Sequence, residues 1–179
     1  MNFKNLETNR LLLRSISKND SLDIFNYLSK DEVTKYLGKT SLKCENDAKI
    51  LIDKILKASS EGNGMRWGIV LKEDNKLIGL AGYNSIDFKN KKCNLGYDID
   101  STYWYNGYGM EAVSEIIRYA FYDLNLHRIE AEVVIGNNSS SNLLTKLGFK
   151  KEGTLRQSIF KEDVFLDVEI FSLIKNILL

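Results

Sequence analysis

Hydrophobic residues near the start of the chain pass from an extended run to helical spacing. Residues 11–16 are mostly apolar and predict a first strand. Leu22, Phe25 and Leu28 then recur at helical spacing, after a candidate N-cap at Asn19 or Asp20. Three helices are expected here: a short one over about 20–28, one turn around 33–37, and a longer one from Asp47 that ends at 62–64.

The period changes to that of strands after residue 64. Strands are expected at 66–71, 77–83 and 94–99, and polar turns at 73–76 and 87–92 separate them. The later elements expected are an amphipathic helix over about 109–124, a strand at 129–134, a short helix over about 141–147, and strands at 149–156 and 165–173. Without a repeat, linker or low-complexity stretch, this order predicts one α/β domain with a mixed sheet.

Composition and charge narrow the class of protein. The chain has 179 residues, of which 44% are hydrophobic and 27% charged, as in ordinary soluble domains. Because 25 Lys and Arg nearly balance 24 Asp and Glu, nothing favours nucleic acid or an anionic membrane as a partner. The N-terminal residues lack the apolar stretch of a signal peptide, and no apolar run approaches the ~20 residues of a membrane span. A cytoplasmic protein is expected.

The cysteines and the histidine give no metal pattern. Cys44 and Cys93 lie far apart and are expected to be reduced, packed thiols. His127 is the single histidine, which excludes a His-rich metal site and any mechanism that needs two histidines. No metal is expected.

A glycine-containing turn, 104–109, lies between a strand and a helix. The first amides of a helix lack internal partners and lie at the positive end of its dipole, so this turn suits an anion. A strand–helix corner without a ligand is one alternative. Another is a dinucleotide site, because 107–112 fits G-x-G-x-x-A and Glu130 follows at about the expected distance. Three preceding strands, and only about 70 following residues, disfavour that alternative.

Several blocks of residues in the second half occur in one order and at one spacing, and together they are specific. These blocks are 95–100, 103–112, 126–131, 137–140, 146–149 and 152–156, preceded by 7–14 near the start. In them the chain resembles the GNAT N-acetyltransferase superfamily, and within it the Rim-type branch, which includes ribosomal-protein N-terminal acetyltransferases. The resemblance covers residues 7–175, which are expected to form one domain.

The resemblance implies a fold and a cofactor. It implies a mixed, mostly antiparallel α/β (α+β) sheet of about six to seven strands, with helices on both faces and a splayed central strand pair. The pantetheine arm of acetyl-coenzyme A would lie in the splay, and its diphosphate on the turn 104–109. The residues expected to bind the cofactor are Tyr97, Ile99, Trp104, Asn106, Gly107, Tyr108, Gly109, Met110, Glu111, Asn137 and Asn142.

The sequence departs from the family pattern within the turn. Tyr105 stands where glycine is frequent. Met110 stands where a hydroxyl residue is frequent, so backbone amides must bind the phosphates there.

The resemblance also implies catalytic residues. Ser140 is the candidate to protonate the departing thiolate, with helix capping as its alternative role, and Asn137 would contact the reacting centre. Ile159 stands where some Rim-type enzymes place a glutamate base, so Asp98 becomes a candidate base unless it faces solvent beside Lys92.

Three further positions complete the picture of the site. A backbone N–H near Ile99 would stabilise the oxyanion. Asp167 and His127 are expected to be structural.

The expected reaction is acetyl transfer from acetyl-coenzyme A to a primary amine by direct attack in a ternary complex, since no cysteine lies in a motif block. The acceptor is a protein N-terminal α-amine or a small-molecule amine, bound by residues 17–65 and the hairpin loops. A coenzyme-A-binding module without turnover is the alternative, and a homodimer is left open.

Overall fold

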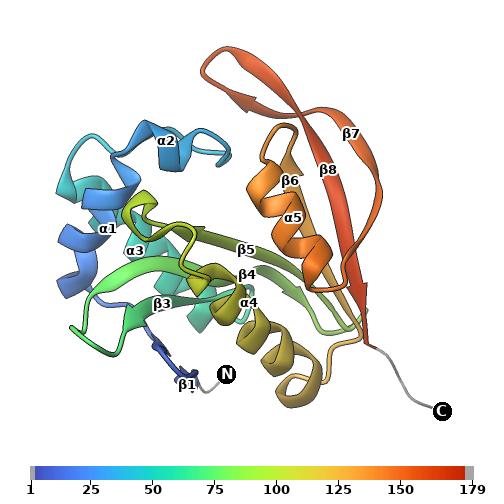
Figure 1. Ribbon diagram of the computed structural model, residues 1–179, viewed down its shortest axis with the longest axis horizontal. Helices are drawn as coiled ribbons and strands as arrows, with labels where there is room; N and C mark the ends of the chain where they lie inside the picture. The colour runs from blue at the N-terminus through green and yellow to red at the C-terminus, as the bar shows by residue number, and fades with distance from the viewer. Residues whose placement is uncertain (1–2, 176–179) are drawn as a thin grey trace.

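The computed structural model describes residues 3–175 and contains one open sheet of eight strands (Figure 1). The strands are β1 (Leu6–Glu7), β2 (Leu11–Arg14), β3 (Met65–Leu71), β4 (Leu77–Asp87), β5 (Lys92–Ile99), β6 (Arg128–Val134), β7 (Lys150–Lys161) and β8 (Val164–Ile174). Their order across the sheet is β1-β2-β3-β4-β5-β6-β8-β7. The expected α/β domain with a mixed sheet is therefore confirmed.

Neighbouring strands are antiparallel except for β5 and β6. A parallel pair needs a crossover connection, and α4 (Tyr108–Arg118) supplies it. The sheet has more strands than the six to seven expected, because β1 is only two residues long and leaves no alternating pattern in the sequence.

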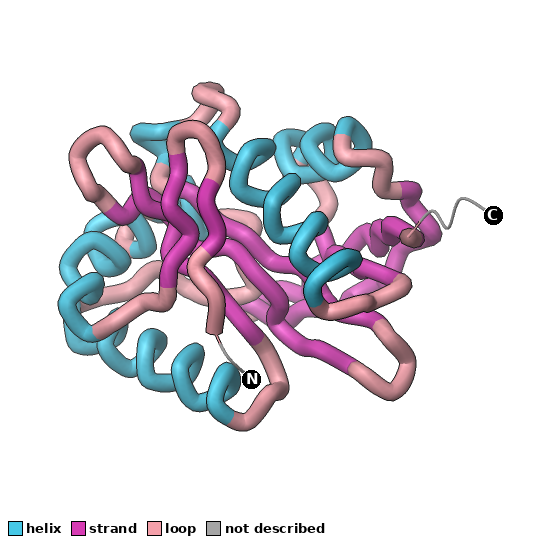
Figure 2. Tube along the Cα trace, turned by 90° about the horizontal axis from the view of Figure 1, so that it is seen from below, coloured by secondary structure: helices cyan, strands magenta, loops and turns pink. Residues whose placement is uncertain are grey.

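Helices cover both faces of the sheet (Figure 2). They are η1 (Lys18–Asp20), α1 (Ser21–Leu28), α2 (Asp31–Thr34), α3 (Glu45–Ser60), η2 (Ser101–Tyr103), α4, the π-helical turn η3 (Tyr119–Asp123) and α5 (Asn138–Lys146). The apolar stripe of α4 buries Ala112, Val113 and Ile116 completely against one face, as its spacing predicts. Residues of α1 and α3 form a second apolar cluster with Val70, Leu77 and Leu80 on the strands.

An aromatic cluster centred on Trp67 lies on the face of the sheet that α4 covers. The Trp67 ring is fully buried, and its centroid lies 5.1, 5.7 and 5.5 Å from those of Phe3, Tyr83 and Tyr119. The Tyr83 hydroxyl donates a 2.6 Å hydrogen bond to the Ile116 carbonyl of α4. Such edge contacts and a satisfied hydroxyl fix how α4 sits on the sheet.

A buried polar network joins α1 to the centre of the sheet. Asp98 on β5 is 7% exposed, and its carboxylate accepts hydrogen bonds from the Tyr27 hydroxyl at 2.6 Å and from Arg66 Nη2 at 2.9 Å. Burial, followed by the nearby Asp98 charge, raises the pKa of Tyr27, so the phenol remains a donor. The network ties α1, β3 and β5 together at the base of the site described below.

The two thiols differ in exposure. Cys93 is buried in β5, and burial raises its pKa to about 12. Cys44 is exposed, so the expectation that both thiols are packed is wrong for Cys44, which precedes the first turn of α3. Both are free thiols, and Cys93 is the unreactive one because the thiolate is the nucleophile.

We expect Asp98→Ala to lower the free energy of unfolding by about 3–5 kcal/mol, because it leaves the Arg66 guanidinium buried without its counter-charge. Tyr27→Phe removes one hydrogen bond to the same carboxylate and should lower it by about 1.5–3 kcal/mol. Urea unfolding followed by circular dichroism measures both changes. A loss below about 1 kcal/mol for Asp98→Ala, the size typical of a surface pair, would contradict this role.

Candidate active site

Strands β5 and β6 separate halfway along their length. Their parallel pairing runs from Lys92 opposite Arg128 to Leu95 opposite Ala131 and stops there. Beyond it, β5 continues to pair with β4 as far as Ile99, while β6 continues to pair with β8. The predicted splay is confirmed, and Figure 1 shows the two strands diverging beneath α5. The edge of β5 over 96–99 therefore lacks a strand partner on this side.

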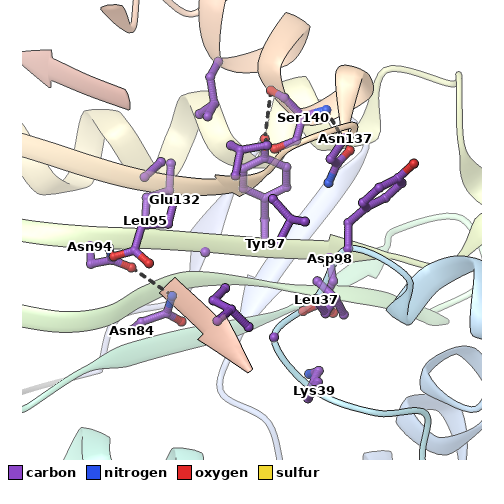
Figure 3. Close-up of a pocket in the computed structure, with 18 of the residues that line it drawn as sticks. Leu37, Lys39, Asn84, Asn94, Leu95, Tyr97, Asp98, Glu132, Asn137 and Ser140 are labelled. Atoms are coloured by element: carbon purple, nitrogen blue, oxygen red, sulfur yellow. Dashed lines mark hydrogen bonds between the residues drawn. The ribbon is translucent and has the colours of Figure 1, made fainter. Parts of the chain in front are cut away.

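A cavity of about 320 Å³ opens at the splay (Figure 3). Its walls come from the loop after α2, the strands β3 to β6, the start of α5 and β7. The lining residues are Tyr36, Leu37, Gly38, Lys39, Arg66, Asn84, Asn94, Leu95, Gly96, Tyr97, Asp98, Ala131, Glu132, Val133, Val134, Asn137, Ser140, Leu144 and Ile159. A small, half-enclosed site with several convergent polar groups suits a ligand.

Tyr97, Ser140 and Asn137 meet at the α5 side of this cavity, as Figure 3 shows. The Tyr97 and Ser140 hydroxyl oxygens are 2.7 Å apart, and the Asn137 side chain accepts a 3.2 Å hydrogen bond from the Ser140 backbone N–H. Asn137 is thus the N-cap of α5, and the alternative that the Ser140 hydroxyl caps this helix is wrong. Burial raises the pKa of Tyr97 to about 12, so the pair keeps a proton to donate at neutral pH.

The turn 104–109 offers a row of backbone donors. Within residues 3–175, no hydrogen bond uses the backbone N–H groups of 105–110. Tyr105 and Gly107 have φ of 63° and 81°, which turns successive amides the same way. A side chain at Gly109 would put its Cβ 3.2 Å from Leu143 Cδ1. This cradle fits an anion such as a diphosphate.

The side chains of Trp104 and Asn106 bond to nearby backbone carbonyls, whereas the Tyr105 side chain is exposed. Trp104 Nε1 donates a 2.8 Å hydrogen bond to the Ile99 carbonyl, and Asn106 Nδ2 donates to the Tyr103 and Trp104 carbonyls at 3.3 and 3.0 Å. Tyr105 is 96% exposed in the left-handed region, which explains why glycine would suit this position. The backbone N–H groups of Tyr108, Gly109 and Met110 have no partner among the described residues, and their binding of phosphate stays a prediction.

Glu111 differs from its expected role as a cofactor contact. Its backbone N–H donates to the Gly107 carbonyl, and its carboxylate accepts hydrogen bonds from Thr8 Oγ1 at 2.6 Å and Arg10 Nε at 2.7 Å. These bonds lower the pKa of Glu111 against the opposing effect of burial. Glu111 therefore anchors the N-terminal segment, and its contact with a cofactor stays an untested prediction.

Through this anchor Arg10 lies beside the turn. Its Nη1 donates a 3.0 Å hydrogen bond to the Asn106 carbonyl, and its guanidinium carbon is 4.4 Å from the centre of the Tyr108 ring. Sequence reasoning missed this cation, because about 95 residues separate it from the turn in the chain.

Two carboxylates line the cavity, and they differ in availability. Asp98 is held by Arg66 and Tyr27, and Lys92 pairs with Glu130 instead, so the expectation that Asp98 faces solvent beside Lys92 is wrong. Glu132 is exposed, and within residues 3–175 it forms no ion pair and accepts one 3.3 Å hydrogen bond, from Asn94 Nδ2. Glu132 is therefore the carboxylate that a ligand in the cavity can reach.

Other expected residues have structural contacts. Asp167 accepts a 2.7 Å hydrogen bond from the Gln157 backbone N–H, which supports the irregular part of β7. His127 bonds through its backbone to Lys91 and Lys175, at the start of β6. Asn142 is exposed and does not line the cavity, so its proposed cofactor contact stays a prediction.

Three further observations concern the dinucleotide alternative, metal sites and membrane-spanning helices. Glu130, the ribose-binding residue of the dinucleotide alternative, is paired with Lys92 and Arg128. Among residues 3–175 there is no cluster of three or more metal-ligating side chains. No helix in the described part of the chain is both long and apolar enough to cross a membrane.

Comparison with known sequences identifies the family. Residues 10–150 match the model of the acetyltransferase (GNAT) domain. The chain is 37% identical to the uncharacterized N-acetyltransferase YoaA of Bacillus subtilis (strain 168), over 97% of this chain and 98% of that protein. It is 40% identical to the uncharacterized N-acetyltransferase p20 of Bacillus licheniformis, over 96% of each.

Comparison with solved structures agrees. The ribosomal-protein-S5-alanine acetyltransferase of Vibrio fischeri superposes with a TM-score of 0.83 at 26% identity, over 96% of each chain. RimL, the ribosomal L7/L12 α-N-protein acetyltransferase, determined with coenzyme A, gives a TM-score of 0.87 at 15% identity, over 96% of this chain and 98% of RimL. The chain therefore belongs to the GNAT acetyltransferase family, resembles its Rim-type branch, and is an N-acetyltransferase.

Proposed function

We propose that this protein transfers the acetyl group of acetyl-coenzyme A to a primary amine by direct attack in a ternary complex. The observation that carries the proposal is the continuity of three features: the unbonded amides of 105–110, the unpaired edge of β5 over 96–99, and the cavity with its Tyr97–Ser140 pair. Diphosphate, pantetheine and thioester would occupy them in that order. RimL, which shares the fold, was determined with coenzyme A. The microcin C7 self-immunity acetyltransferase MccE, which also shares the fold, was determined with acetyl-coenzyme A and AMP.

Pantetheine amides can pair with the edge of β5 much as a strand would. The hydrogen bonds that β6 does not make over 96–99 are then available to the cofactor, except at the Ile99 carbonyl, which already accepts from Trp104 Nε1. A backbone N–H of this edge, near Ile99, would stabilise the carbonyl oxygen as negative charge develops on it. Arg10 would add positive charge beside the diphosphate.

Glu132 is the proposed proton acceptor. The amine nitrogen attacks the thioester carbonyl carbon, its proton passes to Glu132 directly or through water, and the carbon–sulfur bond breaks. Asp98 remains an alternative base by residue type, but using it would break a buried ion pair with Arg66. Ile159 lines the same cavity and supplies no carboxylate.

The Tyr97–Ser140 pair is the proposed proton donor. Ser140 would give its proton to the departing thiolate and take one from the Tyr97 hydroxyl, which enters the step protonated because burial raises its pKa. The tyrosinate then regains a proton from solvent, which also receives the proton that the amine lost. Asn137 holds the first turn of α5 and so fixes Ser140. Its contact with the cofactor belongs to this proposal.

The acceptor class and setting are also proposals. Relatives include an enzyme named for acetylating the alanine of ribosomal protein uS5, in Escherichia coli (strain K12), which supports an N-terminal α-amine among the acceptors. A small-molecule amine remains the other class. We expect the reaction to occur in the cytoplasm, where Cys44 and Cys93 stay reduced. The homodimer and the domain limits 7–175 stay predictions.

Release of free thiol from acetyl-coenzyme A, with a panel of amines and peptides, tests the function and the base together. We expect acceptor-dependent release that falls about 100- to 10,000-fold in kcat for Glu132→Gln, because the amide cannot take the proton. Glu130→Gln, on the same strand but outside the cavity, is the matched control. Saturable coenzyme A binding without release across the panel would favour a binding module without turnover. An unchanged kcat in Glu132→Gln would refute the assignment of Glu132 as the general base.

Ser140→Ala should lower turnover more than it weakens coenzyme A binding, because the hydroxyl acts on the leaving sulfur. Ser139→Ala, at an exposed neighbouring position, should change neither. Steady-state kinetics and calorimetric binding separate the two effects. Equal turnover in Ser140→Ala and the parent protein would refute the role as proton donor.

Gly109→Glu should weaken coenzyme A binding by about 100-fold or more, because its carboxylate would lie where the diphosphate is expected. Gly109→Ala keeps the backbone N–H and adds only a Cβ beside Leu143, so its loss should be much smaller. Isothermal titration measures both, after circular dichroism has established that each variant folds. Equal affinities for the two variants would place the diphosphate elsewhere.

A further inference from the structure

The loop after α2 holds Lys39 at the wall of the cavity. The loop is anchored on both sides: Lys161 Nζ of β7 donates a 2.8 Å hydrogen bond to the Thr34 carbonyl, and the Ser41 hydroxyl donates to Asp31 Oδ1 at 2.6 Å. A Cβ at Gly38 would lie 3.6 Å from Ile159 Cδ1, so the loop and β7 touch. Lys39 therefore lies on a loop that is held in place at the cavity wall. Figure 3 shows it across the cavity from Ser140.

Within residues 3–175, Lys39 has no hydrogen-bond or ion-pair partner for its ammonium, although it is half-buried. The charged groups that influence it are Asp98 and Arg66, which already pair with each other at 2.9 Å. Burial lowers the pKa of Lys39, and the Asp98 charge only partly opposes this. A cation held at such a wall without a partner favours an anionic ligand.

The ionisable groups of the cavity thus leave two charges unmatched. Arg66 and Asp98 cancel, while Lys39 is positive and Glu132 is negative. The two lie at separate places in Figure 3 and form no ion pair with each other. A molecule that carries an ammonium group and an anionic group satisfies both at once.

We propose that Lys39 binds a carboxylate or phosphate of the acceptor, so that the preferred substrate is a small amine bearing an anionic group, as an amino acid does. This inference rests on the proposed acetyl transfer and names its acceptor class. The acceptor amine would lie on the Glu132 side, near Ser140, and its anion on the Lys39 side. A cavity of about 320 Å³, part of which the acetyl group occupies, leaves room for a small acceptor. Polyamines would bring a second cation to Lys39 and are disfavoured.

The test compares each amine with its uncharged counterpart: amino acids with their carboxamides, and phosphoethanolamine with ethanolamine. The parent protein should prefer the anionic member by about 10- to 100-fold in kcat/KM, the size expected of one charge-assisted hydrogen bond. The two pairs distinguish carboxylate from phosphate. Lys39→Met should bring the ratio close to one, and Lys39→Arg should retain most of it. Lys35→Met removes a charge from the same loop outside the cavity and should keep the ratio.

A second measurement does not need turnover. In protein labelled with ¹³C at lysine Cε, the N-acetyl amino acid should raise the pKa of Lys39, whose signal is identified by its loss in Lys39→Met. The corresponding N-acetyl carboxamide should not raise it. A ratio near one in the parent protein, or the same ratio in Lys39→Met, would overturn the proposal. So would a pKa of Lys39 that does not respond to the carboxylate. Absence of thiol release with every amine, together with a responding Lys39, would instead refute the proposed function alone.

Discussion

The end of hydrogen bonding between β5 and β6, after Leu95 and Ala131, is the constraint on which the rest of the site depends. Both strands remain fully paired on their other sides, β5 with β4 and β6 with β8, so the gap does not weaken the sheet as a whole. Backbone groups along a strand must be satisfied by some partner. The splay therefore creates both a slot and the hydrogen-bonding groups to hold a ligand within it.

Three devices keep this slot open. The Tyr27–Asp98–Arg66 network fixes β5 to β3 and α1 just beside the splay. An irregular pairing near Asn84 bends β4, and the Asn84 side chain lies where a Cβ at Gly96 would stand. On the other side, Asn137 caps α5 and directs Ser140 toward Tyr97. In each case the partners of the polar groups come from the fold itself, so these side chains are positioned without a ligand.

Some charged residues in and near the cavity are paired within the fold, and others have no ion-pair partner among the described residues. Asp98 and Arg66 form an ion pair with each other, and the Glu111 carboxylate is hydrogen-bonded to Thr8 and Arg10. Glu132 and Lys39 remain accessible from the cavity without ion-pair partners in the described chain. Residue type alone does not reveal this division, because all of these are ordinary charged residues in the sequence. Only the distances between them show which charges are paired.

Most helices and strands can be predicted from the sequence, and so can the turn 104–109 that is proposed to bind the diphosphate. Hydrophobic periodicity predicts the apolar face of α4 and most strands, and the turn 104–109 lies in consecutive residues, so its amides are set by local backbone conformation. The composition of the cavity, in contrast, is visible only in the folded structure. Lys39, Arg66, Glu132 and Ile159 come from four separate segments, and no local pattern predicts that they share a cavity. The tertiary structure also decides that Asp98 is buried in an ion pair, since its partners, Tyr27 and Arg66, lie 71 and 32 residues away along the chain. Local interactions can be predicted because they join residues that are close in sequence. Long-range pairs depend on how the sheet and the helices pack, and the sequence does not show this directly.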